Sequence, residues 1–106
     1  MAKKVRPRTE RRAKEREARE LVRARQKLAL LESGGSAERP IEVPSSSVIE
    51  PRASSLPCPL CGGGVAIADH QARTVGGRSL RVVSVICQRC GVGRQRWFRI
   101  GSPLPQ

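Results

Sequence analysis

The chain has 106 residues, enough for one small domain with some extra segments, and a formal net charge of +12. A chain this basic is expected to associate with polyanions: nucleic acid first, then an anionic membrane surface or an acidic protein. No apolar run approaches the ~20 residues that span a bilayer, and no apolar segment follows the basic N-terminus, so we expect a cytoplasmic chain in a reducing compartment.

The charge is concentrated in two blocks. Residues 1–32 carry twelve basic and five acidic side chains, and residues 57–106 carry seven arginines and a single acid, Asp69. The stretch between them holds two basic and three acidic side chains. The sequence therefore predicts two basic regions joined by a nearly neutral connector.

Residues 6–32 predict one long helix, so that 1–32 forms a basic helical arm. Glu, Arg, Lys, Ala and Leu, all good helix formers, dominate the stretch. Oppositely charged side chains stand four residues apart, as in Glu10–Lys14 and Glu15–Arg19. We expect the helix to end at the Ser-Gly-Gly of residues 33–35.

The second half of this helix carries a short leucine stripe, defined by Leu21, Ala24, Leu28 and Leu31 at 3-4-3 spacing. One interpretation is a solvated helix that is only partly formed in isolation. The other is a basic arm that folds along a phosphate backbone while Leu21, Leu28 and Leu31 dock on a partner. The stripe is too short to predict a coiled coil.

The next segment has the composition of a linker. Residues 33–57 hold four prolines and seven serines with little periodicity. We therefore expect residues 33–56 to be a flexible, disordered linker.

A β-rich region follows. The run 65–68 is weakly strand-like, Gly76-Gly77 marks a hairpin turn, and the β-branched run 80–86 predicts a strong strand. Residues 94–100 predict a third strand. In one interpretation Trp97 or Phe98 joins the core and the other is more exposed, and in the other interpretation, which is slightly favoured, both complete a minimal core. Residues 102–106 are predicted to be a loose tail.

All four cysteines lie in two C-x2-C pairs at the ends of this region: Cys58 and Cys61, then Cys87 and Cys90. Two intervening residues let a tight turn direct both sulfurs at one ion, and four thiolates close a tetrahedral shell with no open position. Gly62 and Gly91, each directly after a pair, suit such a turn because glycine can take positive φ. A domain of this size usually needs a metal or disulfides to fold. We therefore predict one structural Zn²⁺ held by the four cysteines.

The two Cys-x-x-Cys-Gly sequences resemble the knuckles of the zinc-ribbon fold group. The resemblance covers residues 57–101 and implies a small metal-stabilised β domain, with a three-stranded antiparallel sheet and the ion at one end. The 25 residues between the pairs exceed the usual 15–20. We expect a longer first hairpin, around residues 69–77, to absorb the difference.

Other interpretations of the cysteines fit less well. A rubredoxin-type iron site usually comes with an aromatic-rich core, a thioredoxin-like motif needs a helix after a cysteine pair, and disulfides need an oxidising compartment. With four sulfurs available, His70 is expected to be a surface residue of the hairpin, and its replacing one cysteine as a ligand is the minor alternative.

We predict a non-enzymatic protein that binds nucleic acid, with RNA or the ribosome favoured over DNA. Positions expected to contact nucleic acid are basic or aromatic: Lys3, Lys4, Arg6, Arg8, Arg11, Arg12, Arg81, Arg94, Arg96, Trp97 and Arg99. Two alternatives stay open. One is an adaptor that docks on a transcription or translation machine through the leucine stripe, and the other is a thiolate-based metal or redox sensor.

Overall fold

The computed structural model describes residues 7–101 of the chain. In chain order the elements are α1 (Pro7–Leu31), β1 (Ile41–Val43), a short 3-10 helix η1 (Ser46–Val48), α2 (Ile49–Ser55), β2 (Val65–Val75), β3 (Arg78–Cys87) and β4 (Gly93–Ile100). The predicted contacts of Lys3, Lys4 and Arg6, and the predicted tail, lie outside the described residues.

The strands form one four-stranded mixed sheet in the order β1-β4-β3-β2. The pairs β2–β3 and β3–β4 are antiparallel, whereas β1 joins β4 in parallel, with Ile41 opposite Phe98. The prediction of a three-stranded antiparallel sheet is thus incomplete, because the sheet has a fourth strand that is parallel to its neighbour. This fourth strand comes from the segment predicted to be a linker, because three residues of that segment meet the exposed edge of β4.

The hairpin between β2 and β3 is longer than the apolar run 65–68 suggests. Its turn lies at Gly76-Gly77, as predicted, and both glycines have positive φ, 57° and 78°. The β2 strand continues through polar residues to Val75, which pairs with Arg78, and a bulge lies between Ile67 and Asp69. Backbone pairing with β3, rather than apolar content, extends the strand.

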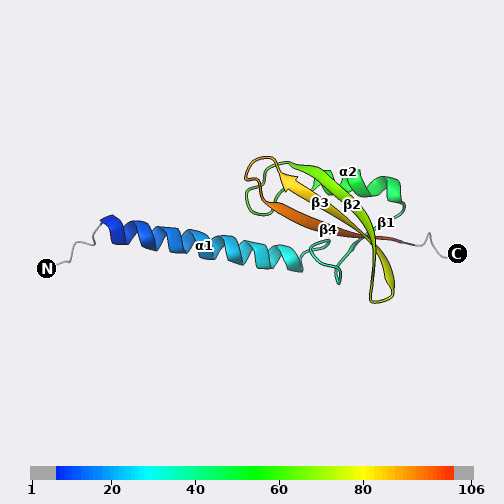
Figure 1. Ribbon diagram of the computed structural model, residues 1–106, viewed down its shortest axis with the longest axis horizontal. Coiled ribbons are helices and arrows are strands. Elements are labelled where there is room, and N and C mark those ends of the chain that lie inside the picture. The colour runs from blue at the N-terminus through cyan, green and yellow to red at the C-terminus, as the bar shows by residue number, and fades with distance from the viewer. Residues whose placement is uncertain (1–6, 102–106) are drawn as a thin grey trace.

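The core lies between α2 and one face of the sheet (Figure 1). Ile49 and Ala53, four residues apart on α2, are both 0 % exposed, and so is Phe98 of β4. Val43, Val83 and Val85 complete the core cluster. The prediction of a disordered linker over 33–56 is therefore wrong for 41–55, whose sparse apolar residues are the ones that cover the sheet.

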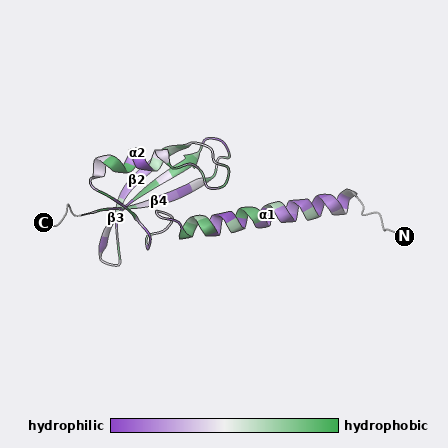
Figure 2. Ribbon diagram, turned by 180° about the vertical axis from the view of Figure 1, so that it is seen from behind, coloured by the Kyte–Doolittle hydropathy of each residue, from purple (hydrophilic) through white to green (hydrophobic). Residues whose placement is uncertain are grey.

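The long helix agrees closely with the predicted range 6–32 and extends away from the sheet (Figure 1). The molecule measures 75 × 25 × 22 Å as a result. Figure 2 shows α1 hydrophilic toward its N-terminus and increasingly hydrophobic toward its C-terminus. Among residues 8–31 of α1, only Ala29 is buried, at 1 % exposure, so most of the helix faces solvent.

The C-terminal end of α1 is attached to the edge of β4 that β1 leaves open. The backbone N–H of Trp97 donates to Gly34 O at 2.8 Å. A Cβ at Gly35 would lie 2.0 Å from Ala29 O, so the chain turns back against the helix too closely for any side chain there. Arg25 Nη1 donates to Leu60 O at 2.8 Å, which connects the helix to the first cysteine pair. These contacts fix where the helix leaves the sheet.

Among residues 7–101, no helix is long and apolar enough to cross a membrane.

Candidate metal centre and basic surfaces

The two cysteine pairs form matching turns. Gly62 N–H donates to Cys58 O at 2.7 Å, and Gly91 N–H donates to Cys87 O at 3.0 Å. Both glycines have the predicted positive φ, 75° and 76°. In each turn the first cysteine's N–H also bonds a carbonyl five residues on: Gly63 O at 2.9 Å for Cys58 and Val92 O at 3.0 Å for Cys87. The same local chemistry thus produces the same turn twice.

The sheet brings the two turns together. Cys61 precedes β2 by a short glycine segment and Cys87 ends β3, and the register places Val65 opposite Cys87. Gln88 N–H of the second turn donates to Gly64 O of the first at 2.9 Å. The hairpin and this hydrogen bond therefore bring together two turns that 25 residues separate in the sequence.

The four sulfurs converge on one point, as the spacing predicts. All four Sγ atoms lie within 4.8 Å of one another. Cys58 Sγ and Cys90 Sγ are 3.8 Å apart, and Cys61 Sγ and Cys87 Sγ are 3.4 Å apart. Such a cluster could hold one metal ion, and the predicted convergence of the four cysteines is confirmed.

Backbone amides point at two of these sulfurs. Cys87 Sγ accepts from Arg89 N–H and Cys90 N–H, both at 3.3 Å, and Cys61 Sγ accepts from Gly63 N–H at 3.4 Å. The Cys90 N–H bond, with the others, outweighs the effect of burial and lowers the pKa of the Cys87 thiol to about 6. Donors directed at sulfur stabilise the thiolate, which is the form that binds metal.

Cys90 titrates in the opposite sense. The Val92 N–H acts to lower its pKa, but burial and the three neighbouring sulfurs together raise it to about 11. Four thiolates this close cannot all ionise without a cation between them. A cation bound between the four sulfurs would relieve this repulsion.

His70 is not part of this cluster. It lies on β2, half-buried against α2, and its Nδ1 is 3.3 Å from Glu50 Oε2. It connects the helix to the sheet rather than lying on the hairpin surface as expected.

The predicted nucleic-acid contacts do not share one surface. Arg8, Arg11 and Arg12 are exposed on α1. On the sheet, Arg81 and Arg94 are half-buried, and the exposed Arg99 is paired with Glu42 at 2.9 Å. By strand alternation Arg94 lies on the face of β4 opposite Arg99.

Arg96 was predicted to contact nucleic acid, but the structure places it inside the protein. It is 3 % exposed, and its Nη2 donates to Pro57 O at 3.1 Å. Burial, together with the charge of Arg94, lowers its pKa. The side chain ties β4 to the segment before the first cysteine and is not presented to a phosphate.

The two aromatic residues divide between core and surface, as in the less favoured of the two interpretations. Phe98 is fully buried, and Trp97, half-buried, lies opposite Val82 of β3 on the other face of the sheet. Trp97 therefore exposes only part of its side chain for stacking on a base.

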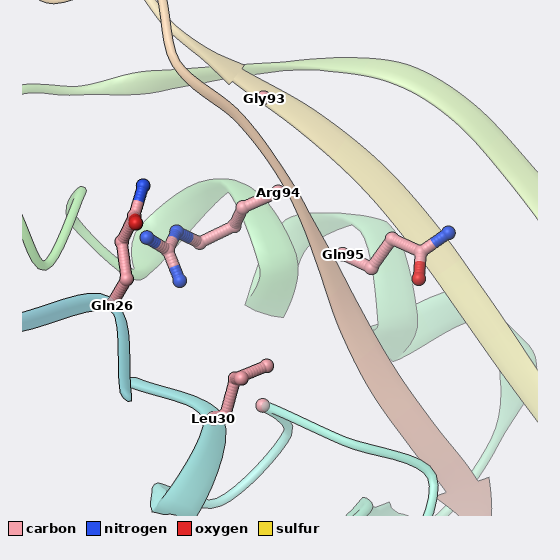
Figure 3. A pocket seen from close by; sticks show the side chains of 6 residues that line it. Gln26, Leu30, Gly93, Arg94 and Gln95 are labelled. Atoms are coloured by element: carbon pink, nitrogen blue, oxygen red, sulfur yellow. The ribbon is translucent and has the colours of Figure 1, made fainter. Parts of the chain in front are cut away.

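A pocket of about 310 Å³ separates α1 from β4 (Figure 3). Gln26 and Leu30 line it from the helix, and Gly93, Arg94 and Gln95 line it from the strand. Arg94 Nε, shielded from solvent, has no hydrogen-bond partner in the described structure. Nothing in the sequence indicates that these residues of α1 and β4 meet, because more than sixty residues separate them in the chain.

The leucine stripe is not packed in the structure. Leu21, Leu28 and Leu31 are 52 %, 61 % and 58 % exposed.

Comparison of the chain with protein-family models, with curated proteins and with solved structures finds no match in any of the three.

Proposed function

We propose that the protein is a non-enzymatic zinc protein that binds nucleic acid, RNA in preference to DNA. The cysteine cluster carries the zinc part of the proposal. With Zn–S bonds of about 2.3 Å, a regular tetrahedron has sulfur–sulfur edges of about 3.8 Å. The distance of 3.8 Å between Cys58 Sγ and Cys90 Sγ, and that of 3.4 Å between Cys61 Sγ and Cys87 Sγ, are close to that value.

Four sulfur ligands favour zinc over the oxygen-preferring ions, and they leave no coordination position for a substrate. The role of the ion would then be structural. It would hold the two cysteine turns at one end of the β2–β3 hairpin, which is the arrangement that the zinc-ribbon resemblance implies. Since Arg25 bonds the first turn at Leu60 O, the ion would also support the base of α1.

The exposure of α1 supports the nucleic-acid part. The helix is rich in arginine, almost none of its surface is buried, and it extends far beyond the sheet (Figure 1). A basic rod of this kind fits a polyanion, whose phosphates arginine contacts with little dependence on sequence. The half-buried Arg81, Arg94 and Trp97 would add contacts from the sheet.

The test is a titration of the zinc-loaded full chain against labelled single-stranded RNA, structured RNA and duplex DNA. Fluorescence anisotropy is measured at several salt concentrations, with polyglutamate as a competitor that is acidic but lacks phosphate. We expect RNA to bind most tightly, with affinity falling steeply as salt rises, and polyglutamate to compete poorly. Absence of binding to all three nucleic acids at low salt would contradict the proposal.

A second function is favoured by the exposed leucine stripe, which would dock on a protein partner. The variant Leu28→Glu separates the two functions. The leucine stripe is apolar and so does not contact phosphates. If the first function holds, the substitution therefore leaves nucleic-acid binding almost unchanged. If the adaptor function holds, the same variant loses its partner while substitutions of arginines in 8–19 are tolerated.

A further inference from the structure

The arginines of α1 are not spread evenly around the helix. Five of them follow one another at 4-4-3-4 spacing and so share one face. We call this set the basic stripe: Arg8, Arg12, Arg16, Arg19 and Arg23. All five are exposed.

The opposite face carries the leucine stripe and charges of both signs. Glu10, Lys14 and Glu17 lie in line with Leu21, Ala24, Leu28 and Leu31, again by helical spacing. In the described part of α1, no carboxylate lies within 4.0 Å of a basic group. The ion pairs among the described residues, His70–Glu50 and Arg99–Glu42, lie outside this helix. The charge of the basic stripe is therefore not neutralised by the i,i+4 pairs that the sequence suggested.

The basic stripe continues into the pocket between α1 and β4. Gln26 and Leu30 follow Arg23 at 3-4 spacing, and both line that pocket. Arg94 reaches into it from the strand, and Figure 3 shows its guanidinium directed toward Gln26. The basic face of the helix and the Arg94 side of β4 thus belong to one side of the molecule.

We propose that the basic stripe and Arg94 form a one-sided track for a nucleic-acid phosphate backbone, while the leucine-bearing face of α1 points away from it. The inference rests on the proposed function and specifies its surface. From Arg8 to Leu30 the helix rises about 33 Å, comparable to one turn of a duplex. A track of this length contacts several phosphates at once.

An anionic membrane fits this helix less well. Helices that lie on membranes carry their basic residues beside a broad apolar face. Here the leucines lie opposite the basic stripe, so insertion of the leucines would turn the stripe away from the headgroups.

Two variants with the same loss of charge, in the same turns of the helix, test the track. Arg12→Gln/Arg16→Gln removes two charges from the basic stripe, and Arg11→Gln/Lys14→Gln removes two from outside it. Glutamine is a good helix former and all four positions are exposed, so both variants should fold. A third variant, Arg94→Gln, tests the end of the track on the sheet. Circular dichroism and zinc content check the fold of each.

The measurement is the slope of log K against log salt for the RNA and the duplex, with vesicles of anionic phospholipid as a further ligand. Each phosphate contact contributes about 0.7 to the slope for single strands and about 0.9 for duplex DNA. We expect the stripe variant to lose about two such contacts and Arg94→Gln about one, whereas the Arg11/Lys14 variant keeps nearly the full slope.

Equal losses in the two double variants would overturn the track and leave a diffuse attraction to the whole helix, with the proposed function intact. An unchanged slope for both would remove α1 from the interface. An unchanged slope for Arg94→Gln would mean that the track is limited to α1 and does not include Arg94. Failure of the unmodified chain to bind any nucleic acid would instead contradict the proposed function itself, and binding to vesicles alone would assign the basic surface to lipid.

Discussion

The glycine after each cysteine pair occupies a backbone position that other residues adopt at a cost. Gly62 and Gly91 have φ of 75° and 76°, and a Cβ at either would meet nothing within 4 Å. The requirement for glycine is therefore purely one of backbone conformation. In this conformation the N–H of the glycine donates to the backbone carbonyl of the first cysteine of the pair, and the two sulfurs converge.

Gly62→Ala tests this requirement against a nearby control. A left-handed conformation costs a residue with a Cβ about 1–2 kcal/mol, so the variant should be less stable by about that amount. Gly64→Ala, where φ is not positive and a Cβ would lie 3.8 Å from Gln88 Oε1, should be nearly neutral. Chemical denaturation of the zinc-loaded chain measures both, and equal stability of the two variants would refute the account of the turn.

Residue identity and spacing were sufficient to predict the cysteine cluster and the positive φ of its glycines, because both follow from local chemistry. They were not sufficient for Arg96. Its alternation with Phe98 on β4 was visible in the sequence, but its burial depends on the segment ending at Pro57, which only the folded chain places above it. The burial of an arginine through one tertiary hydrogen bond has no sequence signature.

At the scale of the elements, α2 is the least expected part of the fold. It has seven residues, and one of them is a proline, so it has little tendency to be helical alone. Ile49 and Ala53 face the sheet at full burial, and the exposed serines around them gave the segment the composition of a linker. Tertiary contact, not propensity, makes this helix.

Ile49→Ala should therefore destabilise the protein by about 2–5 kcal/mol, the usual cost of truncating a buried isoleucine. The matched control is Val48→Ala, since Val48 is 36 % exposed and immediately precedes Ile49. Thermal unfolding of the zinc-loaded variants compares them. If both variants unfold at the temperature of the unmodified chain, residues 41–55 do not cover the sheet.

The strands illustrate the same difference between local and tertiary signals. The β-branched run 80–86 and the Gly76-Gly77 turn predicted β3 and its hairpin, because both are encoded locally. The parallel pairing of β1 with β4 joins residues more than fifty positions apart through a strand of three residues. Such a short strand is too weak a pattern to be predicted from the sequence.

At the scale of the whole molecule, the dominant feature is the projecting helix. The radius of gyration is 18.8 Å, whereas a compact domain of this length has about 13 Å. The contacts of Gly35, Arg25 and Trp97 hold only the base of α1, so the arm reaches solvent on nearly all sides. This geometry is what makes a long one-sided contact with a polyanion feasible.

Small-angle X-ray scattering of the zinc-loaded chain at low concentration should give a radius of gyration near 18.8 Å and a longest dimension near 75 Å. Moderate salt limits repulsion between these basic molecules during the measurement. A radius near that of a compact domain would mean that α1 folds back on the sheet and that the basic stripe is not displayed as described.

The measurement that tests the central claim most directly is the native mass of the full chain purified in the presence of zinc. The account predicts a single species that carries one zinc ion in place of protons of the four thiols, and that broadens into an unfolded charge-state distribution once a chelator removes the metal. A compact, metal-free species would contradict it, whether its mass shows four intact thiols or the loss of four hydrogens to two disulfides.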